Sequence, residues 1–445
     1  MRGLGFEVDD DNDPVPENIP NPGEDTPNGE QSWGWNGICY RKSQNISNVQ
    51  PKLKHGIENI PSCPTQQTIC KLFYTLFPIR FLENTILKNT NMNLAQDADE
   101  ITLVELLRFI GIWFFLATTA GFPRKDFFSK FPVNAMHGAP YRVNHWMSRR
   151  RFDTILQTLA FCEPNPPPYK DKFWQVRALI KAWNDNMTVV CESGWITCLD
   201  ESMSRWLNRW TCPGWMFVPR KPKPFGNEYH SICCGTSGIV FAIQLCEGKD
   251  RPKELPSPPR NKKTTQLLLD LYQSLYSSGK IVVLDSGFSV LIALIALRAL
   301  GVFACAVANK RKYWPLYVPG DEIDQRMEDK PVGSTDALKG VVNNIPYNIF
   351  VMKEPDYAMK LMGTYGGLTT LSDEPDVTRV VDGQKKTFKY TTNFLTILNT
   401  ATWSTTTTTF DTQPLLWKKH GKHIGGRIEC LHFCWPSLKS TCICT

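Results

Sequence analysis

The sequence lacks the features that are typical of secreted, membrane-spanning and repeat proteins. Its N-terminus is acidic where a signal peptide needs a basic region, so we expect no secretory signal. It contains no internal repeat and no P-loop. The most apolar window, residues 289–308, is interrupted by Arg298 and Gly301. We therefore expect a buried helix, a break and a buried strand there, and no membrane span.

Cysteine usage and size indicate a folded protein of a reducing compartment. The chain has 445 residues, of which 42% are hydrophobic, which is enough for two or three domains with a sizeable core. Its 15 cysteines occur without a secretory signal. Because disulfides persist only in oxidising compartments, we expect the nucleus or the cytoplasm.

Charge is unevenly distributed along the chain. The net charge is +7, but the first 30 residues carry nine acidic side chains and one basic one, so the remainder carries +15. Residues 1–60 are also rich in Pro, Gly and Asn, which predicts an acidic, disordered N-terminal arm. A basic body favours a polyanionic partner such as nucleic acid. The alternative is an ordinary surface with solvated lysines.

Residues 61–190 have the pattern of a mostly helical region. Apolar residues recur at helical spacing from Ile69 to Phe77, and Pro78 ends that helix. A second helix follows it. A third is expected after Thr102, which forms a capping box with Glu105. Two more helices are expected around the segments "MSRRRFDTILQTLAF" and "DKFWQVRALIKAWN".

Residues 191–390 predict a mixed α/β core. The segments "GWITCLD", "HSICC", "IVFAIQLC" and "KIVVLD" are short, apolar or alternating, and bounded by glycine or turn residues, as strands are. Gly235–Gly238 carries a hairpin turn signal. Helices are expected in "KTTQLLLDLYQSLY" and "VLIALIALRALG". Residues 318–346 read as a solvated, loop-rich insertion.

Two aspartates follow apolar strands. We expect Asp200 to end the strand "GWITCLD" and Asp285 to end "KIVVLD". A carboxylate at the end of a buried strand is costly unless it is paired, capping or functional. Each could cap the helix that follows it. Two such positions together favour metal binding, since strand ends of α/β sheets are where sites collect.

Two basic clusters lie further along the chain, the second of them at the end of the strand expected before residue 308. Their members are Arg220, Lys221 and Lys223, which alternate with prolines, and Lys310, Arg311 and Lys312. The prolines keep the first cluster extended, so its cations can meet phosphates, and the aromatics that flank it can stack on bases or pack in the core. The alternative is a solvated basic loop. Carboxylates beside cations suit two-metal chemistry on a phosphodiester.

Several ordered segments resemble the piggyBac transposases. They include "TLVELLRFIGIW", "MSRRRFDTILQTLAF", "DKFWQVRALIKAWN", "LDESMSRW", "FVPRKPKPFG", "VVLDSGFSV" and "VANKRKYWP", and the resemblance covers roughly residues 65–390. It implies an RNase H-like catalytic core, preceded by a helical DNA-binding and dimerisation region.

The resemblance also implies a chemistry and its residues. The family cuts and pastes DNA at TTAA targets through three aspartates that bind Mg²⁺ or Mn²⁺. By position, Asp200 is the first aspartate and Asp285 the second, and both are expected metal ligands. Ser286 replaces the family's usual asparagine. The implied partners are DNA and a second copy of the chain, in the nucleus.

The family's third aspartate block does not follow Tyr390. The acids near its expected place stand in another context: Asp373, Glu374, Asp376, Asp382 and Asp411. The pattern changes abruptly after about residue 390, so residues 391–445 are expected to be an aberrant tail. Its cysteines are spaced C-x3-C-x7-C-x-C, which lacks the paired knuckles of a zinc site, and we expect no zinc there.

A shifted reading frame is our hypothesis for this tail. Codons chosen for residues 394–445 and read two bases later can encode the family block "LNHFKYRHLEYDDNNLRHSTP", followed by "LEETW". The threonine run Thr405–Thr409 then becomes Asp-Asp-Asn-Asn within that block. The shift would fall near residues 391–394.

Three functions are compatible with this sequence. The first is a transposase-derived enzyme, which as encoded is expected to be inactive because the third aspartate is missing. The second is a domesticated, non-catalytic DNA-binding protein that uses the basic face of the same fold. The third is an unstable product of a decayed transposable element.

Overall fold

The computed structural model describes residues 66–389, Gly34–Trp35 and Lys52–Leu53. Its description of the long segment omits residues 119–121, 130–138, 140, 211, 220–223, 236, 248–262, 309–319, 343, 356, 366–376 and 382. The chain divides into two compact units. Among the described residues, the N-terminal unit holds those between 52 and 247, and the C-terminal unit combines residues 34–35 with those between 263 and 389.

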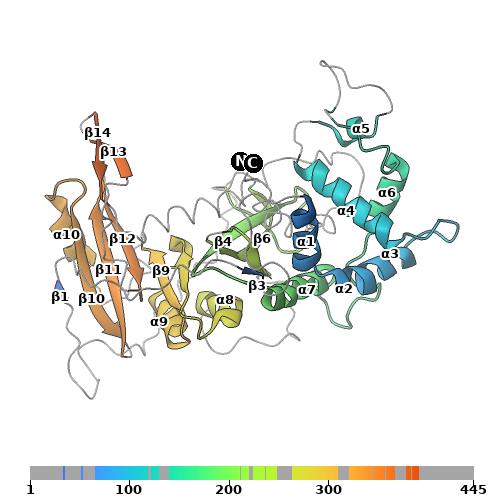
Figure 1. The fold of residues 1–445 in the computed structure, drawn as a ribbon. Coiled ribbons are helices and arrows are strands. Elements are labelled where there is room, and N and C mark those ends of the chain that lie inside the picture. Colours follow the sequence, from blue (N-terminus) through green and yellow to red (C-terminus); the bar gives the residue numbers. More distant parts are fainter. Residues whose placement is uncertain are drawn as a thin grey trace, which may run out of the picture. The chain divides into compact units, whose positions relative to one another are not determined.

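Helices make up the first part of the N-terminal unit (Figure 1). They are α1 (Gln66–Leu76), α2 (Ile79–Phe81), the π-helical turn η1 (Leu82–Leu87), α3 (Lys88–Met92), α4 (Leu103–Thr118), α5 (Arg124–Phe127), α6 (Arg149–Thr158) and α7 (Trp174–Val190). The helices expected from the sequence are therefore confirmed. Pro78 separates α1 from α2, because proline cannot continue a helix from within it.

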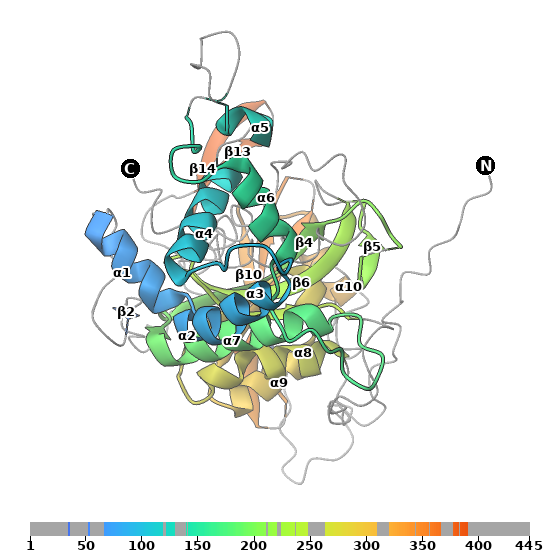
Figure 2. The same cartoon turned by 90° about the vertical axis from the view of Figure 1, so that its right-hand side faces the viewer.

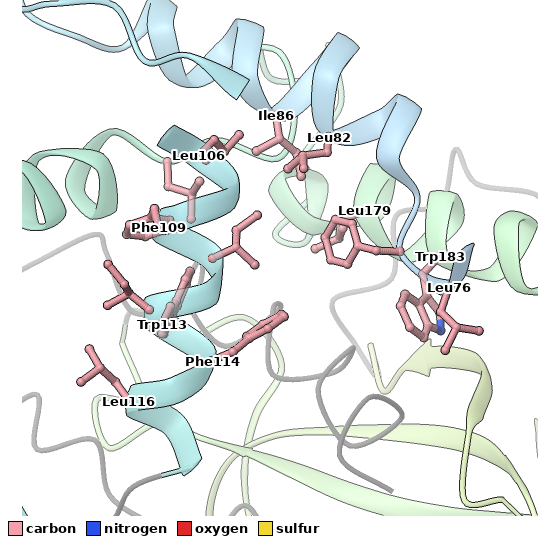
Figure 3. Close-up of a cluster of buried hydrophobic side chains, with 14 of the residues drawn as sticks. Leu76, Leu82, Ile86, Leu106, Phe109, Trp113, Phe114, Leu116, Leu179 and Trp183 are labelled. Atoms are coloured by element: carbon pink, nitrogen blue, oxygen red, sulfur yellow. The ribbon is translucent and has the colours of Figure 1, made fainter. Parts of the chain in front are cut away.

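Aromatic and aliphatic side chains from these helices form one buried core (Figure 3). Trp183 of α7 is 1% exposed and lies near Leu76 of α1, as the close-up shows. Phe109 of α4 is fully buried, with its ring centroid 4.8 Å from that of Phe152 of α6. Burial of such side chains is worth about 1.5–3 kcal/mol each, so this core holds the helices together.

One of the two hydrogen bonds of the capping box predicted at the start of α4 is confirmed. Thr102 Oγ1 accepts a hydrogen bond from the backbone N–H of Glu105 at 3.2 Å. The Glu105 carboxylate binds Arg151 of α6 through two hydrogen bonds of 2.7 and 2.8 Å. Arg151 also donates to the carbonyl oxygens of Asp99 and Glu100, so it ties α6 to the segment before α4. Figure 2 shows α4 and α6 close together.

The Glu105–Arg151 pair should make stability depend on pH. The hydrogen bonds from Arg151 lower the pKa of Glu105 below its ordinary value of 4.5. A carboxylate with a lowered pKa stabilises the fold above its ordinary pKa, and this contribution is lost as pH falls through the lowered value. We expect Glu105→Gln to cost about 1 kcal/mol at pH 7 and close to nothing at pH 3. Denaturant unfolding at both pH values measures this, and an equal cost at both would contradict it.

A small antiparallel sheet completes the N-terminal unit. Its strands are β4 (Ile196–Arg205), β5 (Trp215–Phe217), β6 (Phe225–Cys234) and β7 (Val240–Leu245). Strand β6 pairs with β4, β5 and β7, and the short β2 (Lys52–Leu53) pairs with β3 (Cys191–Glu192). The predicted hairpin is confirmed: Gly238 has φ +68° and its N–H bonds to Cys234 O at 2.8 Å.

Helix α7 is joined to the segment after β7 by an ionic cluster. Arg177 donates to both oxygens of Glu247 at 2.9 and 2.6 Å, and to both oxygens of Asp171. The side chains of Asp171 and Glu247 are 1% and 9% exposed. Burial opposes ionisation of Asp171, yet Arg177 and the Phe173 N–H hold the pKa of Asp171 below its ordinary value. Asp171 is therefore charged at neutral pH.

The C-terminal unit contains a mixed sheet. Its strand order is β1 (Gly34–Trp35), β10 (Thr335–Val342), β11 (Ile345–Lys353), β12 (Ala358–Gly363), β9 (Phe303–Val307) and β8 (Ile281–Leu284). Strands β8 and β9 are parallel, and the other neighbours are antiparallel. The unit also holds α8 (Lys263–Tyr272), the 3-10 turn η3 (Gln273–Leu275), α9 (Leu291–Ala299), and the hairpin of β13 (Val377–Val381) and β14 (Gln384–Phe388). Helices α8 and α9 lie side by side (Figures 1 and 2).

The apolar window of residues 289–308 folds as expected. It forms helix α9, a break and strand β9. Gly301 makes the break at φ +77°, where a Cβ would lie 2.7 Å from Ser277 Cα. The Arg298 guanidinium lies 4.3 Å from the centre of the Phe303 ring, which accommodates its charge. None of the helices in the described part of the chain is long and apolar enough to cross a bilayer.

The predicted loop-rich insertion at residues 318–346 is wrong. Helix α10 (Gly320–Glu328) and strand β10 (Thr335–Val342) lie there. Among residues 321–328 of α10, whose burial is described, only Ile323 and Met327 are buried, at 0% and 2% exposure, and the other positions are acidic or polar. Two apolar positions at i and i+4 anchor a helix in the fold but are too few to stand out in a sequence.

Candidate active site

Asp200 lies in the middle of β4, on the strand that pairs with β6. It is opposite Ser231, and its Oδ1 accepts a hydrogen bond from the Glu201 N–H at 2.8 Å. The carboxylate is half-buried, whereas Leu199 before it is 1% exposed. Asp200 is therefore held at the boundary between the core and solvent.

The prediction that Asp200 ends its strand is wrong. Strand β4 continues through five more residues to Arg205, all of them paired with β6. The polar run Glu201–Arg205 looks like a loop in the sequence, but the antiparallel partner satisfies its backbone groups, and Met203 is buried at 4% exposure. Long-range pairing thus extends the strand beyond its apolar half.

Asp285 directly follows β8, as predicted, and is exposed. The four residues of β8 are all buried. The Asp285 Oδ1 accepts a hydrogen bond from the Ser286 N–H at 2.6 Å, so Asp285 caps the 3-10 turn η4 (Ser286–Phe288). Ser286, which replaces the family's asparagine, provides this bond through its backbone. Both interpretations of Asp285 are therefore confirmed: it lies at the end of its strand, and it caps the helical turn that follows.

The end of β8 shares its edge of the sheet with the end of β9. Leu284 pairs with Ala306 in parallel register, so both strands run toward the same edge. The chain leaves β9 after Val307 at the edge where Asp285 lies. The basic residues Lys310, Arg311 and Lys312 come next in the sequence and lie outside the described residues.

An aromatic stack lies at the base of the β5–β6 hairpin. The Phe217 and Phe225 rings are 4.8 Å apart with an interplanar angle of 20°, and Trp215 stacks on Phe225 at 6.0 Å. Phe217 and Phe225 are 38% and 37% exposed. The Val218 N–H bonds to Pro224 O at 2.8 Å and closes the hairpin loop.

The first basic cluster and the candidates for the third aspartate lie outside the described residues. Arg220, Lys221 and Lys223 belong to the loop of the β5–β6 hairpin, outside the described residues. The same holds for the candidate third acids, Asp373, Glu374, Asp376, Asp382 and Asp411, and for the tail of residues 391–445. Their roles stay predictions.

Each of the two described carboxylates has the chemistry of a ligand for a hard divalent cation. Mg²⁺ and Mn²⁺ prefer carboxylate oxygens, and the N–H of the following residue orients each carboxylate through one oxygen. Asp200 belongs to the N-terminal unit and Asp285 to the C-terminal unit. Each was identified from its place in the sequence relative to an apolar strand.

Sequence analysis missed a group of side chains on and beside β6, the strand that pairs with the Asp200 strand. Glu228 and His230 lie on β6, two residues apart and so on one face, and Cys246 follows β7. Their polar atoms lie within 4.8 Å of one another. The Glu-x-His spacing in a strand was the available signal, but Cys246 joins it only through the β6–β7 pairing.

The comparisons with known proteins agree with this fold. A family model described as Transposase IS4 matches residues 70–399. A solved piggyBac transposase, in a synaptic complex with hairpin DNA, has a TM-score of 0.56 and 15% sequence identity, over 85% of this chain and 77% of that one. Comparison with curated proteins gives no match. The chain therefore belongs to the transposase family of that model, and its mixed α/β fold is that of the piggyBac transposase with its RNase H-like core.

Proposed function

We propose that this chain is a DNA-binding protein of transposase descent that, as encoded, does not complete cut-and-paste transposition. The supporting observation is that Asp200 lies in strand β4 and Asp285 directly follows strand β8, while no family-like third block follows Tyr390. The family match ends at residue 399, close to the change of pattern near residue 391. Two-metal chemistry needs enough carboxylates to hold both cations.

From the family resemblance, Asp200 and Asp285 would each be a ligand of a divalent cation. Such a cation supplies Lewis-acid stabilisation of a phosphodiester and activates the attacking oxygen. The chain's own contribution is orientation, because each carboxylate is fixed by the N–H of its neighbour at 2.8 and 2.6 Å. Substitution by asparagine keeps that acceptor and removes the negative charge, so it isolates the role of the charge.

The basic clusters and the aromatic stack support binding of nucleic acid. Arg220, Lys221 and Lys223 follow the exposed Phe217 in the β5–β6 hairpin, and Phe225 closes it. Cations beside exposed aromatic rings suit a strand whose phosphates meet the cations and whose bases stack on the rings. The family adds TTAA-type targets, a homodimer and nuclear localisation to this proposal.

Binding of duplex DNA should depend steeply on salt. Each phosphate that the protein neutralises adds about −0.9 to the slope of log affinity against log salt. Replacement of Arg220, Lys221 and Lys223 by glutamine is expected to make the slope shallower by up to about 2.7 and to weaken binding at low salt. Fluorescence anisotropy with a TTAA-containing duplex and a scrambled duplex measures both slopes.

The matched control replaces three exposed lysines of the C-terminal unit, Lys330, Lys385 and Lys386, by glutamine. It removes the same charge from the chain and should leave most of the slope unchanged. An equal effect of both triple variants would mean that the hairpin is not the contact surface. A wild-type chain with no salt-dependent affinity would contradict DNA binding itself.

A further inference from the structure

The cluster of Glu228, His230 and Cys246 lies on one face of the sheet in the N-terminal unit. Residues opposite each other in paired strands share a face, so Glu201 and Gln244 lie on the face of His230. The Cys246 N–H bonds to the carbonyl oxygen of Glu228 at 3.0 Å, which places Cys246 beside Glu228. The pairing of β6 with its neighbours therefore brings an acid, an imidazole and a thiol together.

The distances among the three side chains are those of ligands around one ion. Cys246 Sγ lies 3.4 Å from Glu228 Oε1 and 3.9 Å from His230 Nε2. His230 Nε2 lies 3.7 Å from Glu228 Oε1. Zinc bonds of about 2.0–2.3 Å at tetrahedral angles put neighbouring ligand atoms roughly 3.3–3.6 Å apart. The three atoms need to move only slightly to share a zinc ion.

The chemistry of the cluster favours zinc over magnesium. Sulfur and imidazole nitrogen are ligands of Zn²⁺, whereas Mg²⁺ takes oxygen. The side chains of His230 and Glu228 are 9% and 13% exposed, so the cluster is shielded from solvent. The acids Glu228, Glu201 and Glu247 place negative charge around the Cys246 thiol. This surplus of negative potential also favours a cation.

We propose that Glu228, His230 and Cys246 form a zinc site that fastens the end of β7 to β6, with water in the fourth position. Zinc was expected to be unlikely in this protein, on the spacing of the tail cysteines alone. The proposed site uses none of the tail cysteines. It lies on β6, the strand that also pairs with the Asp200 strand, so zinc would stiffen the support of Asp200.

The test measures zinc bound to the full-length chain. The background variant carries serine at the tail cysteines, so that they cannot contribute: Cys430, Cys434, Cys442 and Cys444. After dialysis it should retain one zinc per chain by atomic emission. Cobalt(II) titration should give a thiolate-to-cobalt charge-transfer band. In this background Cys246→Ser should abolish the band and weaken zinc binding at least about 100-fold.

Two further variants serve as controls, one at another cysteine of the same unit and one at a second proposed zinc ligand. Cys212→Ser changes another half-buried cysteine of the same unit, whose thiol contacts Pro213 O at 3.5 Å, and should retain the zinc. His230→Gln should lose it, with circular dichroism to confirm that the variant is folded. If Cys246→Ser unfolds, His230→Gln decides the question. A background chain without bound zinc, or a folded His230→Gln variant with zinc affinity unchanged, would overturn the proposal.

Discussion

The chain as encoded is expected to release no DNA segment in an excision assay, whereas a chain with its shifted frame restored is expected to release it. The restored chain reads the codons after Thr391 two bases later and so regains the Asp-Asp pair in place of the threonine run. Loss of one member of a catalytic set commonly costs about 10³-fold or more. The assay uses a plasmid that carries the genomic flanks of the coding sequence, with Mg²⁺ or Mn²⁺ supplied.

Two aspartate variants make this result interpretable. In the restored chain, Asp200→Asn and Asp285→Asn should each return excision to background. Asp185→Asn is the matched control: its carboxylate pairs with Lys181 on the exposed face of α7 and should leave activity unchanged. Clear excision by the chain as encoded would contradict the proposed inactivity. Coding DNA with a stop codon early in the shifted frame would rule out the frameshift.

Replacement of Arg177 by methionine is expected to destabilise the protein by about 3–5 kcal/mol. Arg177 is the described partner of two carboxylates whose side chains are 1% and 9% exposed, Asp171 and Glu247. Methionine keeps much of the side-chain volume but leaves the two charges together without their cation, and breaking a buried pair from one side is costly. The free energy of unfolding in urea at pH 7 measures the effect.

The control for this prediction is an exposed pair on the same helix. Lys181 binds Asp185 in α7, and their side chains are 77% and 63% exposed. Because exposed ion pairs contribute little, Lys181→Met should change stability by less than about 0.5 kcal/mol. If Arg177→Met were as mild as Lys181→Met, the buried cluster would not stabilise the unit.

The helices and strands that could be predicted are those with a strong local pattern in the sequence. Helix α9 and strand β9 could be predicted because an apolar run is divided by Gly301, a residue suited to φ +77°. Helix α10 could not, because Ile323 and Met327 are the only buried residues among its described positions 321–328. The second half of β4 was also missed, since its strand conformation depends on pairing with β6 and not on its own polar residues.

A site residue could be predicted from the sequence where its position next to an apolar strand was informative by itself. Asp285 follows a strand of four buried residues, which a sequence displays directly. The group of Glu228, His230 and Cys246 depends on a hairpin that brings residues 16 to 18 positions apart into contact. Register across strands is set by the turn and by burial of one face, so such a group becomes visible only in the folded chain.

The position of strand β12 has a consequence for how this protein avoids self-association. Strand β9 pairs with β8 on one side, and on the other side β12 pairs with it through Leu361–Gly363. The meander of β10, β11 and β12 thus occupies backbone donors and acceptors of an apolar strand that would otherwise be a template for another chain. A chain ending before Thr335 would leave that side of β9 open. Such truncated products should aggregate through it, even though β8, α9 and β9 precede the cut.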